Sequence, residues 1–278
     1  MPGLDLTQLM IGLILAAVTA SLGYLGKALS RSGVIAAFFL GSILFGLGGI
    51  AWAILLLAFF IPSSLLSVLF KSRKMPAEAG YEKSSRRDAW QVVANGGLAG
   101  LCAVAHWAFP GSLLPWLAAS AALAAASADT WATELGVLSH KNPVIIFSDR
   151  KVERGTSGAI SLEGEVAALL GSGFIALAST LLFSAGSYSN LAVLPGALPI
   201  TVILSGFIGC QVDSILGATL QAIYFCPSCK KETEKHPFHT CGTQTQRLRG
   251  VRWMNNDWVN FACTLSAALV GVILSVLI

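Results

Sequence analysis

The sequence predicts an all-α polytopic membrane protein, and three observations carry that prediction. The mean hydropathy is +0.72, and 55% of the 278 residues are apolar while only 12% are charged. Apolar runs recur along the chain, and a run of about 18 residues is long enough to cross a hydrocarbon layer. All eighteen Lys and Arg residues lie in four segments between these runs: Lys27–Arg31, Lys71–Arg87, Lys141–Arg154 and Lys230–Arg252.

About eight transmembrane helices are expected in a single domain over residues 1–278. They are, in order, Leu6–Leu25, Val34–Phe45, Ile50–Phe70, Asp88–Phe109, Leu113–Leu138, Ile160–Phe183, Leu198–Tyr224 and Val259–Ile278. The first three carry no charge, and the others combine apolar runs with isolated amides or carboxylates. The second is short and flanked by glycines, so a half-helix or re-entrant segment is expected, because broken backbone persists at membrane depth only inside protein. Gly and Ala recur in these runs, which suits close helix packing in lipid.

The charge distribution predicts the orientation. With eight crossings the four basic segments fall on one face, and the opposite loops near Gly46–Gly49, Pro110–Ser112 and Ser184–Gly196 carry no charge. The positive-inside rule then places the basic face in the cytoplasm and both termini outside. Cations confined to loops indicate membrane topology and not nucleic-acid binding. No transit segment precedes the first helix, so we expect the plasma membrane of a bacterium.

Carboxylates near the ends of the apolar runs are the first candidate site residues. An ionisable group at membrane depth costs several kcal/mol, so it normally faces a cavity and has a partner. Asp129 lies about two turns before the cytoplasmic end of the fifth helix, where it could hold Mg²⁺ that keeps part of its hydration shell. Asp213, Gly217 and Gln221 recur every four residues on the seventh helix, about three turns from its end, and Gly217 would leave room for a ligand. The alternative for Asp213 is a hydrogen-bonded packing residue.

A basic loop and a glycine turn follow the fifth helix. Lys151 and Arg154 precede Gly155-Thr156-Ser157-Gly158, which is expected to lead into the sixth helix. Backbone amides at a helix start, hydroxyl groups and cations together can bind phosphate. The alternative is a polar cap with a surface loop.

Amides form a third set. Gln91 and Asn95 are one turn apart on the fourth helix, and Asn256 and Asn260 are one turn apart at the start of the eighth. Such amides either bind the polar groups of a ligand or hold helices together.

Cysteine and histidine residues mark the last cytoplasmic loop, residues 226–252. Cys226 and Cys229 form a C-x-x-C pair, and His236, His239 and Cys241 follow. Cytoplasmic thiols are normally reduced, so this set suits a tetrahedral structural Zn²⁺ site better than a disulfide. Cys226, Cys229, His239 and Cys241 are the expected ligands, with His239 preferred over His236 because it lies next to Thr240-Cys241.

Five motifs in order carry a resemblance to a known family. They are Arg86–Gly97, Ser127–Gly136, Gly155–Gly158, Asp213–Ala218 and Asn255–Asn260. The chain resembles the integral membrane family that includes the phytyl-phosphate kinase of tocopherol and phylloquinone synthesis. It departs from that family at Ala159, where a second glycine would be expected. The order of Asp129, the basic loop and Asp213 is also similar, more loosely, to the CTP-using dolichol kinases and CDP-diacylglycerol synthases.

The resemblance implies a prenyl-phosphate kinase that transfers a phosphoryl group from CTP or UTP to an isoprenoid monophosphate such as phytyl phosphate. In that mechanism Asp129, Lys151 and Asp213 are catalytic. Asp129 and Asp213 hold Mg²⁺, and Glu134 is a further candidate ligand. The nucleotide and phosphate contacts fall to Arg154, Gly155, Thr156, Ser157, Gly158, Asn95, Asn256 and Asn260. Two alternatives remain open, a CTP-dependent cytidylyltransferase acting on a lipid phosphate and a lipid or ion transporter. A homodimer is compatible with each.

Overall fold

The computed structural model describes residues 5–70, 86–139, 141–185 and 197–277. Within these ranges the chain forms eight α-helices and one π-helix, η1. The helices are α1 (Leu6–Leu25), α2 (Arg31–Ile43), η1 (Leu44–Gly48), α3 (Ile50–Leu69), α5 (Ala89–Ala108), α6 (Leu114–Gly136), α7 (Leu162–Ala185), α8 (Ala197–Thr219) and α9 (Asn256–Leu277). Short strands join them at one end: β1 (Val144–Ile145), β2 (Ala159–Ile160), β3 (Ile223–Cys226), β4 (Lys231–Thr233) and β5 (Gln246–Arg249). The predicted all-α membrane architecture is confirmed.

Six helical segments in the described part of the chain are long and apolar enough to cross a membrane: α1, α2 with η1, α3, α7, α8 and α9. The other two, α5 and α6, have 20 and 23 residues, which is also sufficient length. They are less apolar because α5 carries amides and α6 is rich in alanine and ends with carboxylates.

Two expected elements differ from the structure. The second helix is not short, because α2 continues into η1 and the two make one 18-residue segment, Arg31–Gly48. The seventh helix ends at Thr219 and not at Tyr224, because the chain turns there and enters β3. Asp213 therefore lies less than two turns from the end of α8, and not about three.

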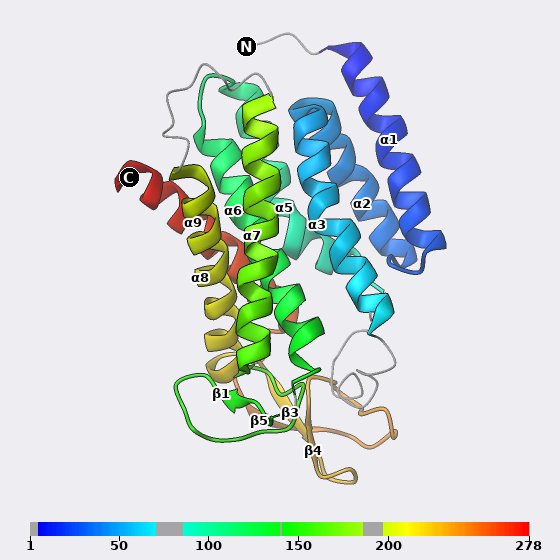
Figure 1. Ribbon diagram of the computed structural model, residues 1–278. Coiled ribbons are helices and arrows are strands. Elements are labelled where there is room, and N and C mark those ends of the chain that lie inside the picture. Colours follow the sequence, from blue (N-terminus) through cyan, green and yellow to red (C-terminus); the bar gives the residue numbers. More distant parts are fainter. Residues whose placement is uncertain (1–4, 71–85, 140, 186–196, 278) are drawn as a thin grey trace.

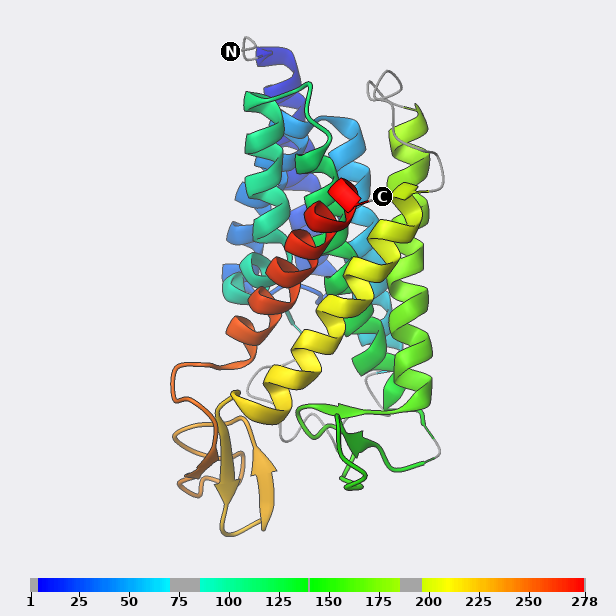
Figure 2. The same ribbon diagram turned by 90° about the vertical axis from the view of Figure 1, so that its left-hand side faces the viewer.

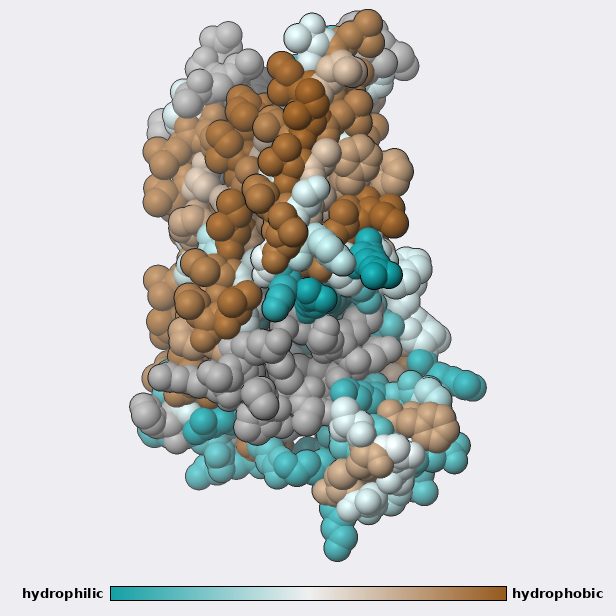
Figure 3. Space-filling view, turned by 90° about the vertical axis from the view of Figure 1, so that its right-hand side faces the viewer, coloured by the Kyte–Doolittle hydropathy of each residue, from teal (hydrophilic) through white to brown (hydrophobic). Residues whose placement is uncertain are grey.

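The helices form one bundle, with all five strands at the same end (Figure 1). The α1–α2 connection lies toward that end too, whereas α1 begins and α9 ends at the other (Figures 1 and 2). Apolar side chains cover the upper part of the face in Figure 3, and hydrophilic ones gather over the lower part. The basic segments thus share one end as expected, except for residues 71–85, which lie outside the described ranges. Residues 186–196 of the expected outer loop also lie outside them.

Helix α6 is the centre of the bundle and packs against α3, α5, α7, α8 and α9. Its residues 115–117 and 119–128 are all buried, and alanine predominates among them. Small side chains let helix backbones approach closely in lipid, where no hydrophobic effect drives helices together. Gly209 of α8 lies at one such contact: a Cβ atom there would be 2.7 Å from the Cβ of Ala125 on α6 and 2.9 Å from that of Ala267 on α9.

We therefore expect Gly209→Ala to destabilise the bundle by about 1–3 kcal/mol, because the added methyl group overpacks the contact between three helices. Gly173→Ala is the matched control. A Cβ atom at Gly173 on α7 would meet nothing within 4 Å, so this change should only gain helix propensity, about 1 kcal/mol. Monodispersity in detergent after heating measures both effects. Equal melting temperatures for the two variants would contradict the close contact.

Candidate functional site

A cavity of about 270 Å³ opens at the end of the bundle that carries the strands. The residues predicted for catalysis or for phosphate and nucleotide binding line this one cavity, with a single exception. Its lining includes Asp129, Glu134, Asp213, Arg154, Gly155, Thr156, Ser157, Gly158, Asn95, Asn256 and Asn260. The exception is Lys151, which is exposed on the loop between β1 and β2 and does not line the cavity.

Two carboxylates from separate helices face the cavity. Asp129 comes from α6, one turn before Thr133, which also lines the cavity. Asp213 comes from α8, and its Oδ2 atom is buried with no hydrogen-bond partner among the described residues. A buried carboxylate oxygen without a donor is costly unless a ligand satisfies it. The pair therefore fits a hard divalent cation such as Mg²⁺, which prefers carboxylate oxygens and retains waters.

Glu134 lies near a half-buried cation, Arg87, which was not among the predicted site residues. Its Oε1 atom accepts a hydrogen bond of 2.6 Å from the hydroxyl of Ser67 on α3. Arg87 also lines the cavity, and its guanidinium lies 5.2 Å from the centre of the Phe59 ring. Burial lowers the pKa of Arg87 to about 10, and the nearby Glu134 carboxylate opposes that shift. Arg87 therefore stays charged at neutral pH. In the sequence, Arg87 could have been noticed as part of the Arg86-Arg87 pair. That pair is equally explained as part of the basic segment that sets the membrane orientation.

The glycine turn is present but does not begin a helix. Strand β2 separates Gly158 from α7, so the expected amides at a helix start are not part of the turn. Gly155 and Gly158 both have positive φ, +84° and +79°, which glycine adopts at little cost. A Cβ atom at Gly158 would lie 2.2 Å from the backbone nitrogen of Ala218. Gly217 accommodates this turn and not a ligand, because its own Cβ position is 2.8 Å from the nitrogen of Gly158.

Two residues from the loop after α8 hold the turn in place, and neither was foreseen. Glu234 lines the cavity and accepts 2.9 Å hydrogen bonds from the Ser157 hydroxyl and from the Gln221 amide. Arg249 donates to the carbonyl oxygens of Gly217 and Ala218 at the end of α8, at 2.8 and 2.7 Å. It also donates to the carbonyl of Ser157 at 3.3 Å. The sequence offers no signal for either residue, because each is one of several charges in a polar loop.

The predicted amides line the cavity, and the hydrogen bonds that the structure shows for Gln91 and Asn95 lie within α5 and its N-cap. Gln91 completes a capping box with Asp88 at the start of α5 and also lines the cavity. Asn95 donates to the carbonyl of Gln91 at 2.9 Å, and Asn260 of α9 is buried at the cavity wall. Gln211, not predicted, donates to Glu165 at 2.7 Å.

The cavity has more acids than bases among the described residues. Five carboxylates line it, Asp129, Glu134, Glu165, Asp213 and Glu234, together with two guanidinium groups, Arg87 and Arg154. Arg154 also donates to the carbonyl of Val137 at the end of α6, at 3.2 Å. An excess of carboxylates attracts cations, and divalent metal ions would offset the repulsion between this lining and an anionic ligand.

A second, apolar pocket adjoins the first. It lies between α1, α2, α3 and α5 and has a volume of about 50 Å³. Arg87, Gln91 and Asn95 line both pockets. An apolar group inserted between these helices would thus meet the polar cavity at its inner end.

The predicted Cys and His ligands also come together, outside the cavity. The ligand atoms of Cys226, Cys229, His239 and Cys241 lie within 4.8 Å of one another. His236 is engaged elsewhere, stacked on the ring of Tyr224 with 4.6 Å between ring centres.

Comparison with known proteins supports the resemblance seen in the motifs. Protein PGR of Arabidopsis thaliana is 30% identical over 292 aligned positions, which cover 98% of this chain and 97% of that protein. An uncharacterized membrane protein of Methanocaldococcus jannaschii is 29% identical, with 97% and 95% covered. Protein VTE6, chloroplastic, of Arabidopsis thaliana is 27% identical, with 88% and 65% covered. No solved structure matches.

The family described as integral membrane protein DUF92 matches residues 14–268. This range contains every cavity-lining residue named above and the Cys/His cluster. The chain is a member of the DUF92 family of integral membrane proteins.

Proposed function

We propose that the protein is a prenyl-phosphate kinase, which transfers the terminal phosphoryl group of CTP or UTP to an isoprenoid monophosphate and forms the diphosphate. One observation carries the proposal: Asp129 of α6 and Asp213 of α8 line a single cavity together with Arg154 and the turn Gly155–Gly158. The family resemblance supports the reaction class and the choice of nucleotide.

The residues divide by role. Asp129 and Asp213, with Glu134 as a further ligand, would hold Mg²⁺, which neutralises charge on the phosphate oxygens when bound. Arg154 and the polar groups of Thr156 and Ser157 orient the triphosphate. Phosphoryl transfer depends on in-line placement and charge neutralisation more than on covalent help from protein groups. A monophosphate acceptor is already ionised near neutral pH, so the reaction needs no strong general base.

The acceptor would enter from the apolar pocket. Its isoprenoid chain would lie between α1, α2, α3 and α5, and its phosphate would reach the polar cavity beside Arg87. A guanidinium that lines both pockets suits an anionic head on an apolar tail, because it can pair with phosphate where the two pockets meet. Asn95 and Gln91 would add hydrogen bonds at the same place.

The proposal puts the site on the cytoplasmic face. The cavity opens at the end where the described basic segments gather, and the positive-inside rule supports a cytoplasmic position for that end, with both termini outside. The proposed location is the plasma membrane of a bacterium, where CTP and UTP are available on that face.

The acid-rich lining favours a second candidate, transport coupled to a cation or proton, because intramembrane carboxylates serve such coupling. A transporter would bind cations without consuming a nucleotide. The assay below therefore separates the two candidates.

Asp129→Asn should abolish phosphoryl transfer, with kcat lower by at least about a hundredfold, because a neutral amide would hold Mg²⁺ much more weakly than a carboxylate does. Asp149→Asn is the matched control, since Asp149 is exposed on a loop and does not line the cavity. The measurement uses purified protein, geranylgeranyl or phytyl monophosphate, and CTP labelled at either the α- or the γ-phosphate. Label arriving only from the γ-position supports the kinase, whereas label from the α-position would indicate cytidylyl transfer. No consumption of CTP or UTP would contradict both.

Arg154→Ala should raise the Michaelis constant for the nucleotide by about tenfold, the loss of roughly 1.4 kcal/mol of a charge-assisted contact, and leave that for the lipid nearly unchanged. Lys151→Ala provides the comparison on the same loop and should have the smaller effect, because Lys151 lies outside the cavity lining. A larger effect from Lys151 would restore the role expected from the sequence and contradict the assignment to Arg154.

Ala37→Phe should reduce kcat/KM for a long isoprenoid phosphate more than for a short one, because the added ring fills the apolar pocket. Ala36→Phe is the neighbouring control, since Ala37 lines the pocket and Ala36 does not. Comparing a five-carbon with a twenty-carbon prenyl phosphate measures the effect. An equal loss for both lengths would show that the chain binds elsewhere.

A further inference from the structure

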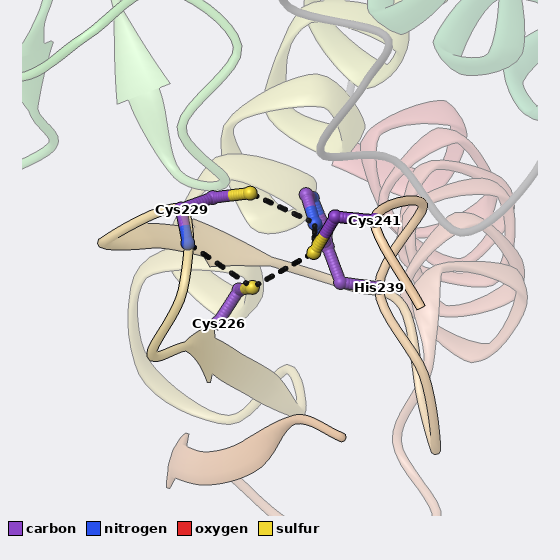
Figure 4. A group of neighbouring side chains, drawn as sticks. All are labelled: Cys226, Cys229, His239 and Cys241. Carbon is purple, nitrogen blue, oxygen red and sulfur yellow. Dashed lines mark hydrogen bonds between the residues drawn. The ribbon is translucent and has the colours of Figure 1, made fainter. Parts of the chain in front are cut away.

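The loop between α8 and α9 contains a cluster of four metal-ligating side chains that the proposed reaction does not use. Cys226 ends β3, Cys229 follows in the turn before β4, and His239 and Cys241 come from a second turn that faces the first (Figure 4). All three cysteines are free thiols. The Sγ atoms of Cys226 and Cys241 are 3.6 Å apart, far beyond the S–S bond length of about 2.05 Å.

The separations between ligand atoms match the edges of a tetrahedron around one zinc ion. Zn–S bonds of about 2.3 Å and Zn–N bonds of about 2.0 Å place two thiolates about 3.8 Å apart, and a thiolate and an imidazole nitrogen about 3.5 Å apart. The Sγ atoms of Cys226 and Cys241 are separated by 3.6 Å, close to the first of these values. The Nδ1 atom of His239 lies 3.5 Å from the Cys229 sulfur and 3.3 Å from the Cys241 sulfur.

The backbone of both turns presents these ligands. In the first turn the amide of Cys229 points at the sulfur of Cys226, at 3.5 Å, as an outer-shell donor to a thiolate would. The carbonyl of Cys226 also accepts from Lys230 at 2.8 Å, and Lys230 has a positive φ of 53°. In the second turn the backbone amide of His239 donates to the carbonyl of Thr243, and the carbonyl of His239 accepts from the amide of Gly242, both at 2.9 Å.

The cluster is joined to the cavity through one short strand. β4 runs antiparallel to β3 from the Cys226–Cys229 turn, and Glu234 follows it directly. Glu234 accepts from Ser157 in the glycine turn and from Gln221 after α8. β4 is an edge strand of three residues that pairs with β3 alone, and a two-stranded hairpin is marginal by itself, so the position of Glu234 depends on what else fixes this loop.

We infer that Cys226, Cys229, His239 and Cys241 bind one structural Zn²⁺, and that this ion holds Glu234 against the turn Gly155–Gly158 and so completes a wall of the cavity. Four protein ligands leave no open coordination position, so the ion acts on folding and not on chemistry. Its binding displaces the protons of three thiols. The inference does not depend on the proposed kinase activity.

The first test is metal content. Full-length protein, purified through a tag without histidine, should contain about one zinc per chain by elemental analysis. His239→Asn should lose the zinc, whereas His236→Asn should retain it, because His236 stacks on Tyr224. Wild-type protein without zinc, or equal loss from both variants, would overturn the assignment.

A second measurement covers the case in which His239→Asn does not fold. Zinc is removed from wild-type protein with a chelator and Co²⁺ is added. The expected result is the visible absorption of tetrahedral thiolate-bound Co²⁺. A spectrum of octahedral Co²⁺ would overturn the site.

Hydrogen–deuterium exchange tests whether the zinc ion fixes the turn Gly155–Gly158 at the cavity. Removal of zinc should increase hydrogen–deuterium exchange of the backbone amides of residues 154–160, while the amides of α6 keep their protection. Restoring zinc should reverse the increase. If zinc binds but exchange in residues 154–160 is unchanged, the ion does not fix the turn.

Discussion

Close packing of five helices around α6 is the contact on which the functional end of this protein depends. Helices in lipid gain nothing from the hydrophobic effect, so their association relies on van der Waals contact and on hydrogen bonds between helices. The alanines of α6 and Gly209 of α8 allow that contact. Because neighbours enclose α6 on all sides, Asp129 and Glu134 near its end face protein groups and a cavity, and not hydrocarbon.

At the end of the bundle that carries the strands, Arg87 and Arg249 have protein partners, which lipid could not provide. The guanidinium of Arg87 lies 5.2 and 5.6 Å from the centres of the Phe59 and Phe60 rings and near the Glu134 carboxylate. Arg249 satisfies the last carbonyl oxygens of α8, which have no partner within the helix. The lining of the cavity carries more acidic than basic groups among the described residues.

Much of this architecture follows from the sequence. The segregation of eighteen cations and the apolar runs predicted the class, the eight helices and the end at which the site lies, and the family motifs brought Asp129, Asp213 and the glycine turn into one group. What the sequence did not predict are contacts between distant segments. Glu234 with Ser157, and Arg249 with Gly217, join a polar loop to a helix end, and nothing in the local pattern distinguishes these charges from their neighbours. The expected length of α8 was wrong for a related reason: Gln221–Tyr224 are apolar enough for a helix, but pairing with β4 and β5 makes Ile223–Cys226 a strand.

The position of α6 in the chain has a consequence for biogenesis. Synthesis proceeds from the N-terminus, so α6 enters the bilayer with its carboxylates before α8, Glu234 and α9 exist. Its own composition gives little drive for partition into lipid. Elements that precede α6 in the chain contact it in the folded structure. α3 and α5 pack against α6, Ser67 of α3 donates a hydrogen bond to Glu134, and Arg87 lies near the same carboxylate with the opposite charge. The helices made before α6 thus include contact partners for its buried carboxylate Glu134, and these partners are synthesised before α7, α8 and α9.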